Sequence, residues 1–430
     1  MAGVASAIDF SVDLQGCGVR IFILGLNFHP ELTGAGKYTA ELASWLSRRG
    51  HEVQVICAPP YYPGWALRDG YRNCWAFEAW QQGGVAIKVR RCPLWVPARP
   101  SGWKRVLHLM SFAASSMPVL FGQLRWKPDV LVAVAPTLAC APAAIAFSKL
   151  ARCPTWLHVQ DFELDAAFGT GQLKQNLVAR FGRAVERALL RGFDRVSTIS
   201  DKMLERLRAK LGRSERTVLL TNWVDPEQLR PLESEAPYRR EFGCAKDDIL
   251  VLYSGSIGEK QGLDTLLEAA AALAGKSRYR FVICGEGPGK EALAARYAHL
   301  RNVTWKPLQP AERLAELLGA ADVHALPQRA GIADLVMPSK LLGMMASGKP
   351  VVAMAAPDTE IWNVMQGRGL VVPPEDSRAL ADAIKQLGAD AALGSRLGAA
   401  ARAFVEENLE RDKVLSAFEA ELVALVDGRL

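Results

Sequence analysis

The amino-acid sequence predicts an α/β protein with two doubly wound domains that face each other across a cleft. Short β-rich runs such as RIFILGLNF (20–28) and HEVQVICA (51–58) alternate with helical patterns. Such alternation is typical of parallel sheets that are covered by helices on both faces. The pattern starts again at ILVLYSGSIG (249–258), after a stretch that contains several prolines. Two separate series of strands and helices therefore indicate two domains rather than one large sheet.

The same pattern sets the expected domain boundaries. We expect a flexible extension over 1–19, an N-terminal domain over 20–221, a linker over 222–232, a C-terminal domain over 233–378, and terminal helices over 379–430 that pack back across both domains. The extension lacks the basic start of a secretory signal. The long apolar run from Val130 contains Pro136 and Pro142, so we interpret it as a buried strand and a packed helix rather than a membrane span.

Composition limits the class of partner. Half of the 430 residues are hydrophobic and 23% are charged, which is typical of a globular protein. The formal net charge of +7 favours an anionic partner: a nucleotide, a phospholipid surface or a nucleic acid. The eight cysteines are scattered and form no C-x-x-C pair, which argues against a zinc site and against a disulfide framework. We therefore expect a reducing, cytoplasmic compartment and no metal.

Glycine-rich loops follow three of the predicted strands. They read TGAGK (33–37), YSGSIGEKQG (253–262) and CGEGPGK (284–290), and the second offers Lys260 as a partner for a phosphate. Glycine lets the backbone approach a ligand closely, and the N-terminus of the following helix attracts negative charge. Neither a dinucleotide fingerprint nor a Walker A sequence is present in its proper context, so each loop alone could be an ordinary turn. Three such loops at strand ends favour a nucleotide site.

A polar cluster in TWLHVQDFELD (155–165) follows another predicted strand. His158 and Asp161, with Gln160 between them, would point into the cleft, where acid–base or sugar-binding groups belong. Alternatively, Asp161 caps the next helix and His158 is a hydrogen-bonded core residue. The pattern alone leaves both interpretations open.

The segment from Ala79 to Pro128 contains no Asp or Glu but is rich in basic residues and tryptophan, around the apolar stretch VLHLMSFAASSMPVLF. Lys and Arg attract anionic headgroups and Trp prefers the membrane interface. We therefore expect an amphipathic helix seated in a membrane surface. The alternatives are a core helix with a basic rim and a nucleic-acid surface, although no nucleic-acid-binding motif accompanies it. The candidate membrane contacts are Arg99, Trp103, Lys104, Arg105, Arg125, Trp126 and Lys127.

Several of these motifs together resemble glycosyltransferase family 4, and most closely its colanic-acid-type exopolysaccharide fucosyltransferases. They are NFHPELTGAGKYTAELASWLSRRG, LHVQDFELD, NWVD, YSGSIGEKQG and MPSK…ASGKPVV. The resemblance implies a GT-B fold of two Rossmann-like domains and a retaining transfer that needs no metal or other cofactor. It also implies a nucleotide-sugar donor, with GDP-fucose favoured, and a lipid-linked saccharide acceptor on the inner face of the plasma membrane.

The resemblance also assigns residues. It places Gly34, Gly36, Ser256, Gly258, Lys260, Glu286, Gly287, Ser339 and Lys340 at the donor, and it leaves His158, Asp161 and Asp334 as catalytic candidates. The sequence departs from the family where two glutamates usually stand, because Leu335 and Gly343 occupy these positions. Asp334 is then the nearest acid for the donor sugar. Gly343 either alters the ribose contact or permits close helix packing, at a cost of up to about 1 kcal/mol relative to alanine.

Three other functions fit the same motifs less well. They are transfer from a UDP-linked sugar such as an N-acetylated amino sugar, nucleotide-sugar epimerisation, and binding of a nucleotide sugar without catalysis. An epimerase needs no lipid acceptor and would leave the basic, tryptophan-rich stretch unexplained.

Overall fold

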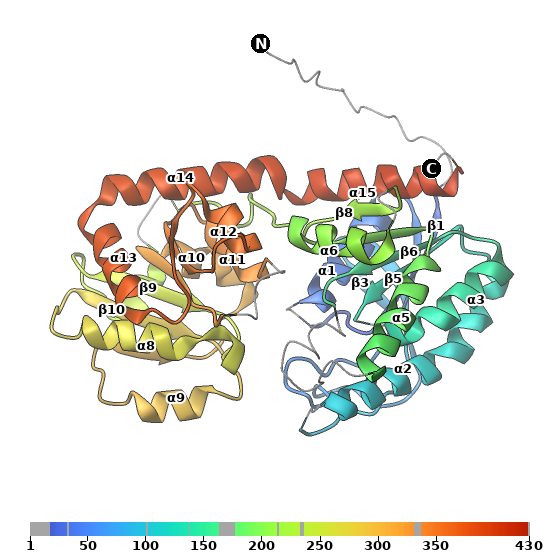
Figure 1. The fold of residues 1–430 in the computed structure, drawn as a ribbon, viewed down its shortest axis with the longest axis horizontal. Coiled ribbons are helices and arrows are strands. Elements are labelled where there is room, and N and C mark those ends of the chain that lie inside the picture. Colours follow the sequence, from blue (N-terminus) through green and yellow to red (C-terminus); the bar gives the residue numbers. More distant parts are fainter. Residues whose placement is uncertain are drawn as a thin grey trace, which may run out of the picture.

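The computed structural model describes residues 18–31, 34–99, 102–136, 138–162, 177–212, 215–232, 236–330 and 337–428. These residues form two α/β halves that lie side by side, with two long helices at the C-terminus running along the top of both (Figure 1). The prediction of two doubly wound domains is confirmed.

The N-terminal half is built on an eight-stranded sheet of order β3-β4-β2-β1-β5-β6-β7-β8. Only the β3–β4 pair is antiparallel. From β1 the sheet extends in one direction through β2, β4 and β3, and in the other direction through β5, β6, β7 and β8. The strands are β1 (Arg20–Gly25), β2 (Glu52–Cys57), β3 (Ala76–Gln82), β4 (Val85–Arg91), β5 (Val130–Ala135), β6 (Thr155–Val159), β7 (Arg195–Thr198) and β8 (Thr217–Leu219).

Helices cover both faces of this sheet because its central strands β1, β5, β6 and β7 are almost fully buried, and β5 is apolar on both sides. The apolar run from Val130 forms β5 and then α3, as predicted. Local signals set the ends of α6: Ser200 accepts a hydrogen bond from the amide of Met203, and Gly212 ends the helix with a positive φ. The helices are α1 (Ala35–Arg48), α2 (Gly102–Gly122), α3 (Ala141–Ala151), α5 (Leu177–Arg191) and α6 (Asp201–Leu211).

The C-terminal half contains a six-stranded, fully parallel sheet of order β11-β10-β9-β12-β13-β14. Its strands are β9 (Ile249–Ser254), β10 (Tyr279–Cys284), β11 (Val303–Lys306), β12 (Val323–Leu326), β13 (Val351–Met354) and β14 (Leu370–Val372). Its helices are α7 (Pro237–Glu241), α8 (Leu263–Ala272), α9 (Lys290–Arg296), α10 (Leu314–Gly319), α11 (Ser339–Ala346), α12 (Glu360–Met365) and α13 (Ser377–Ala389), with the 3-10 turn η3 (Glu259–Gln261).

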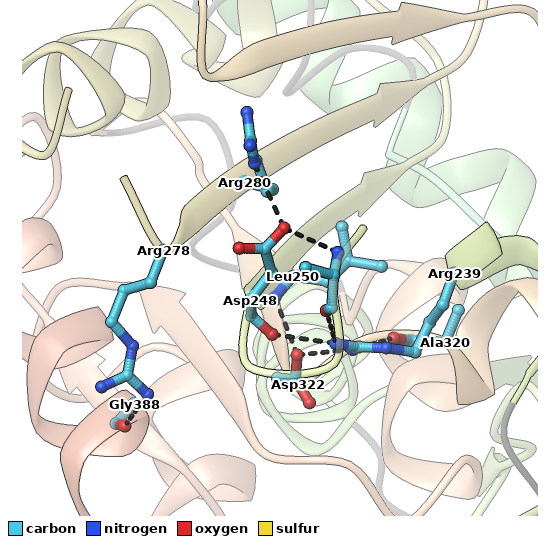
Figure 2. A network of polar contacts seen from close by, with 9 residues as sticks. Arg239, Asp248, Leu250, Arg278, Arg280, Ala320, Asp322 and Gly388 are labelled. Atoms are coloured by element: carbon cyan, nitrogen blue, oxygen red, sulfur yellow. Dashed lines mark hydrogen bonds and ion pairs between the residues drawn. The ribbon is translucent and has the colours of Figure 1, made fainter. Parts of the chain in front are cut away.

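A polar network fixes α7 to the edge of this sheet where the strands begin (Figure 2). The guanidinium of Arg239 donates to a carboxylate oxygen of Asp322 at 2.6 Å and to the carbonyl oxygens of Ala320 and Asp248. Asp322 in turn accepts from the amide of Leu250 at the start of β9. A buried arginine is therefore fully partnered here, as buried charge requires.

The terminal helices α14 (Ala391–Asn408) and α15 (Arg411–Val426) contact different halves. Ala401 and Val405 of α14 belong to the core cluster around α11, whereas Phe418 of α15 packs on Trp156 of β6 with ring centroids 4.8 Å apart. Between the two helices, Arg411 forms an ion pair of 2.8 Å with Asp225 of the connecting segment. The C-terminal helices thus bury apolar side chains against both halves.

Candidate functional site

Sheets of this kind bind ligands in the crevice between two neighbouring strands whose following connections run in opposite directions. In the N-terminal half this point lies between β1 and β5, and in the C-terminal half it lies between β9 and β12. The loops after β1, β9 and β10 and the N-terminus of α11 contain most of the predicted donor-binding residues.

Lys340, in the first turn of α11, reaches over to the end of β9. Its ammonium donates to the hydroxyl oxygen of Tyr253 at 2.9 Å and lies 4.5 Å from the centroid of that ring. The tyrosine hydroxyl in turn donates to the carbonyl oxygen of Ser256 at 2.6 Å. Desolvation lowers the pKa of Lys340 to about 8. A cation held beside a glycine loop, at a helix N-terminus, is suited to binding a phosphate.

The two glycine loops of the C-terminal half pack directly on each other. A Cβ atom at Gly287 would lie 2.1 Å from the carbonyl oxygen of Ile257, and one at Gly285 would lie 1.9 Å from that of Gly255. Gly287 also has a φ of +155°, which side chains rarely adopt. Gly287, which we assigned to the donor, is therefore required for the packing of these two loops.

The remaining predicted residues of these loops lie around them. Ser256 is exposed, and a Cβ at Gly258 would meet the side-chain oxygen of Gln261 at 2.9 Å. Glu286 is exposed and forms an ion pair of 2.7 Å with Lys290. Lys260 lies in η3, but its side chain is outside the described part of the structure.

The two glycines after β1 have different environments. Gly34 is the N-cap of α1 with a φ of +61°, and a Cβ there would meet no atom of the described residues within 4 Å. A Cβ at Gly36 would lie 2.8 Å from the Cβ of Glu31. Glu31 is buried and accepts hydrogen bonds from the amides of Tyr61 and Tyr62. Gly34 is thus available to a ligand, whereas Gly36 makes room for a carboxylate that fixes the loop.

Ser339 joins the two halves. Its side chain lies near the hydroxyl of Tyr38 in α1; burial raises the pKa of that hydroxyl, and Ser339 partly opposes this shift. Tyr38 also packs edge-on against Trp223 with ring centroids 5.1 Å apart. The N-terminus of α11, which carries Ser339 and Lys340, therefore lies near the first helix of the N-terminal half.

His158 lies inside the N-terminal half. Its side chain is 3% exposed, with Nδ1 2.9 Å from the hydroxyl of Ser197 and Nε2 3.1 Å from the side-chain nitrogen of Gln160. Burial lowers the pKa of its imidazole to about 3. A neutral ring with both nitrogens engaged is suited to holding Gln160 in place rather than to exchanging a proton. The geometry therefore supports the core-histidine interpretation and argues against an acid–base role.

Asp161, by contrast, is exposed at the rim of the N-terminal half. It lies near the hydroxyl of Tyr62, whose pKa is raised by burial and further by the charges of Glu31 and Asp161, while Arg105 opposes them. The side chains of three residues therefore lie near one another: Asp161, Tyr62 and Arg105. Asp334, Leu335, Glu163 and Asp165 lie outside the described residues.

Gly343 faces the interior of the C-terminal half. A Cβ there would lie 3.2 Å from Leu318 and 3.7 Å from Leu229, both at their Cδ1 atoms. The glycine therefore permits close packing of α11, which was one of the two expectations.

Sequence reasoning overlooked two residues after β12. Gln328 Oε1 and Arg329 Nε are buried and make no hydrogen bond to the described part of the chain. Both line a small hollow together with Ala356 and Thr359, and Arg329 also pairs with Asp264 at 3.0 Å. The LPQRAG motif directly after a predicted strand was the available signal, but it is not one of the three glycine-rich loops on which we relied.

The predicted membrane helix corresponds to α2. Trp103, Val106, Leu107, Met110 and Met117 are each 45–64% exposed, and their spacing places them on one face. Among the described residues, Gly102–Arg125 is the one helical segment long and apolar enough to cross a membrane, and 28% of its apolar window is buried.

The basic candidates lie at both ends of α2. Arg99 and Arg105 are exposed near its start and Arg125 and Lys127 near its end, while Lys104 is half-buried. Trp126 does not belong to the exposed face. It packs edge-on against Phe22 and donates to Glu52 at 3.0 Å, so its role is structural.

Comparisons with known proteins agree with this geometry. Residues 33–223 match the model of the glycosyl transferase 4-like domain, and residues 234–404 match that of glycosyl transferases group 1. The chain is 40% identical over 410 residues to the putative colanic acid biosynthesis glycosyl transferase WcaI of Escherichia coli (strain K12), covering 93% of this chain and 98% of that protein.

Solved structures show the same fold at low sequence identity. Sucrose-phosphate synthase from Thermosynechococcus elongatus superposes with a TM-score of 0.75 at 18% identity, over 95% of this chain and 100% of that one. Anabaena HepE in complex with UDP superposes with a TM-score of 0.68 at 16% identity, over 94% and 100%.

Proposed function

This chain belongs to glycosyltransferase family 4 and has the GT-B fold, and on that basis we propose that it transfers a sugar from a nucleotide sugar to a lipid-linked saccharide. The observation that carries the proposal is the anion cradle at the N-terminus of α11. There, Lys340 lies beside the loop of Tyr253 and Ser256, and Ser339 lies near Tyr38 of the opposite half.

The cradle suits the chemistry of the leaving group. During transfer, the bond between the sugar's anomeric carbon and the donor diphosphate breaks, and a bond forms to an acceptor hydroxyl oxygen on the same face. The hydroxyl proton passes to the departing diphosphate. Negative charge grows on that diphosphate, and preorganised donors that face it stabilise the transition state. We assign this role to Lys340, which lies at the N-terminus of α11, and to the N–H groups of the first turn of that helix.

We take GDP-fucose as the donor and an exopolysaccharide precursor as the acceptor. The support is the resemblance to exopolysaccharide fucosyltransferases, together with the name of the E. coli relative, which refers to colanic acid biosynthesis. The UDP held by the Anabaena neighbour makes UDP-sugars the competing donors.

We further propose that the enzyme is cytoplasmic and sits on an anionic membrane through α2. The support is the exposed apolar face of α2, the basic residues at its ends, and the position of Arg105 beside Tyr62 and Asp161 at the rim of the N-terminal half. A lipid-linked acceptor would then reach the site from the membrane surface.

The test is release of nucleoside diphosphate by the purified full chain. With GDP-fucose and a lipid-linked saccharide we expect GDP release that requires the acceptor, while UDP-sugars give none. A new sugar formed without acceptor would indicate an epimerase. Thermal stabilisation by a nucleotide sugar without any release would indicate a binding protein and would contradict the proposal.

A further inference from the structure

A second basic hollow lies in the N-terminal half, at the edge of the sheet where the strands begin. It has a volume of about 590 Å³ and is lined by residues from the end of α3, the starts of β6 and β7, the segment before β8, and the end of α15. The donor crevices lie at the opposite ends of the strands. In Figure 1, α15 ends on the side of the molecule away from the C-terminal half.

Three arginines that are distant in sequence meet in this hollow: Arg152, Arg195 and Arg216. Within the described part of the chain, none of their guanidinium groups makes an ion pair or hydrogen bond to another residue. Arg195 is 9% exposed, and its Nε atom is fully buried without a partner.

Such an unpartnered arginine is unusual because burying charge is unfavourable unless the charge is paired. At the corresponding edge of the C-terminal half, a buried arginine is paired as expected. Arg239 donates hydrogen bonds to Asp322 and to backbone carbonyl oxygens (Figure 2). Arg195, the first residue of β7, lacks this arrangement although it also lies at the edge where the strands of its sheet begin.

Two carboxylates also line the hollow. Asp194 is engaged by Thr155, whose amide and hydroxyl both donate to its Oδ2 atom at 2.8 and 2.9 Å. Glu215 is exposed and is not paired with any of the three described arginines. The hollow therefore keeps an excess of positive charge with unused donors.

We propose that this hollow is a second anion site, which binds a phosphate group through Arg152, Arg195 and Arg216. Guanidinium groups match phosphate oxygens with two parallel hydrogen bonds each, and several of them can hold one phosphate group. The same chemistry fits a free phosphate or diphosphate and the headgroup of a phosphomonoester lipid. The site is independent of the donor cradle, so the failure of either proposal leaves the other standing.

The experiment is calorimetric titration of the full chain with inorganic phosphate and with pyrophosphate. Arg152→Ser/Arg216→Ser removes two exposed or half-buried donors and leaves buried Arg195 in place, so folding should be preserved. We expect binding at least ~10-fold weaker in this variant. The part of the binding that Arg152→Ser/Arg216→Ser removes should persist in Lys340→Met, which separates the hollow from the donor cradle. Arg278→Ser/Arg296→Ser, an exposed pair in the C-terminal half, is the charge-matched control and should bind like the parent chain.

A second variant should raise the affinity for phosphate instead of lowering it. Glu215→Gln removes a negative charge from the rim, so phosphate binding should tighten. Flotation with vesicles that contain phosphatidic acid, compared with phosphatidylserine vesicles to account for docking through α2, distinguishes the sources of the phosphate. Extra retention on phosphatidic acid that depends on Arg152 and Arg216, without binding of free phosphate, assigns a lipid headgroup. Equal affinity of the parent and Arg152→Ser/Arg216→Ser, or no saturable binding of any of these probes, overturns the proposal.

Discussion

The ammonium of Lys340 donates a hydrogen bond to the hydroxyl oxygen of Tyr253 over 2.9 Å and so joins the first turn of α11 to the end of β9. This contact brings a cation from one part of the sequence to a glycine loop more than eighty residues earlier. It organises the proposed donor cradle, and two of the predictions depend on it.

Lys340→Met should weaken binding of a nucleoside diphosphate about 10- to 100-fold, because a charge-assisted hydrogen bond to the diphosphate is lost. Calorimetric titration with GDP measures the change. The chain's stability should be retained, since methionine can cover the ring of Tyr253 in place of the lysine stem. Unchanged GDP affinity would show that the diphosphate does not contact this residue.

Donor binding should also depend on pH through Lys340. Its pKa in the free protein is about 8, below the ordinary value of 10.5, because the side chain is desolvated. A bound diphosphate favours the ammonium form and raises the pKa, so binding takes up a proton once the pH exceeds about 8. The dissociation constant for GDP should therefore be level below this pH and rise above it. In Lys340→Met the rise should disappear, and its persistence there would point to another group.

Gly287→Ala should disrupt the interlocked loops. The added methyl group would meet the carbonyl oxygen of Ile257 at 2.1 Å, in a backbone conformation that alanine rarely adopts. We expect a loss of about 2–4 kcal/mol in the free energy of unfolding. Gly275→Ala, where a Cβ meets nothing within 4 Å, is the control and should change it by less than about 0.5 kcal/mol. Denaturant unfolding of both variants checks the contrast.

His158 should act by position rather than by proton transfer. With a pKa of about 3 its ring stays neutral over the working range, so the rate of transfer should show no inflection due to this residue near pH 6.5. His158→Asn, which can keep one bond to Ser197, should lower the turnover number by roughly tenfold or less. Loss of a general acid or base would cost about 10²- to 10⁴-fold, and a loss of that size in the folded variant would restore the acid–base role.

Val106→Asp/Met110→Asp should release the chain from anionic vesicles, because two charges would enter the exposed apolar face of α2. Flotation with vesicles that contain phosphatidylserine measures the effect. Leu308→Asp, at a 50% exposed position of the C-terminal half, is the matched control and should float like the parent. If the parent itself does not float, membrane docking through α2 is wrong.

Much of the fold follows from local sequence. Continuous apolar runs such as that of β5 predict strands buried on both faces, and the two alternating series predict two doubly wound halves. The positions of the glycine loops in the chain could also be predicted. A glycine-rich stretch between a strand and a helix can be recognised from neighbouring residues alone.

Tertiary structure decided what these residues do. Gly34 and Gly287 look alike in sequence, yet one faces open space and the other lies against a backbone carbonyl. His158 follows the pattern of a cleft residue but is buried between Ser197 and Gln160. Arg195 and Arg239 are both buried, but only one of them has partners within the described chain. The sequence determined which elements form, because periodicity and propensity act within a few residues. Contacts, burial and pKa depend on atoms that are distant in the chain, and only the packed structure brings these together.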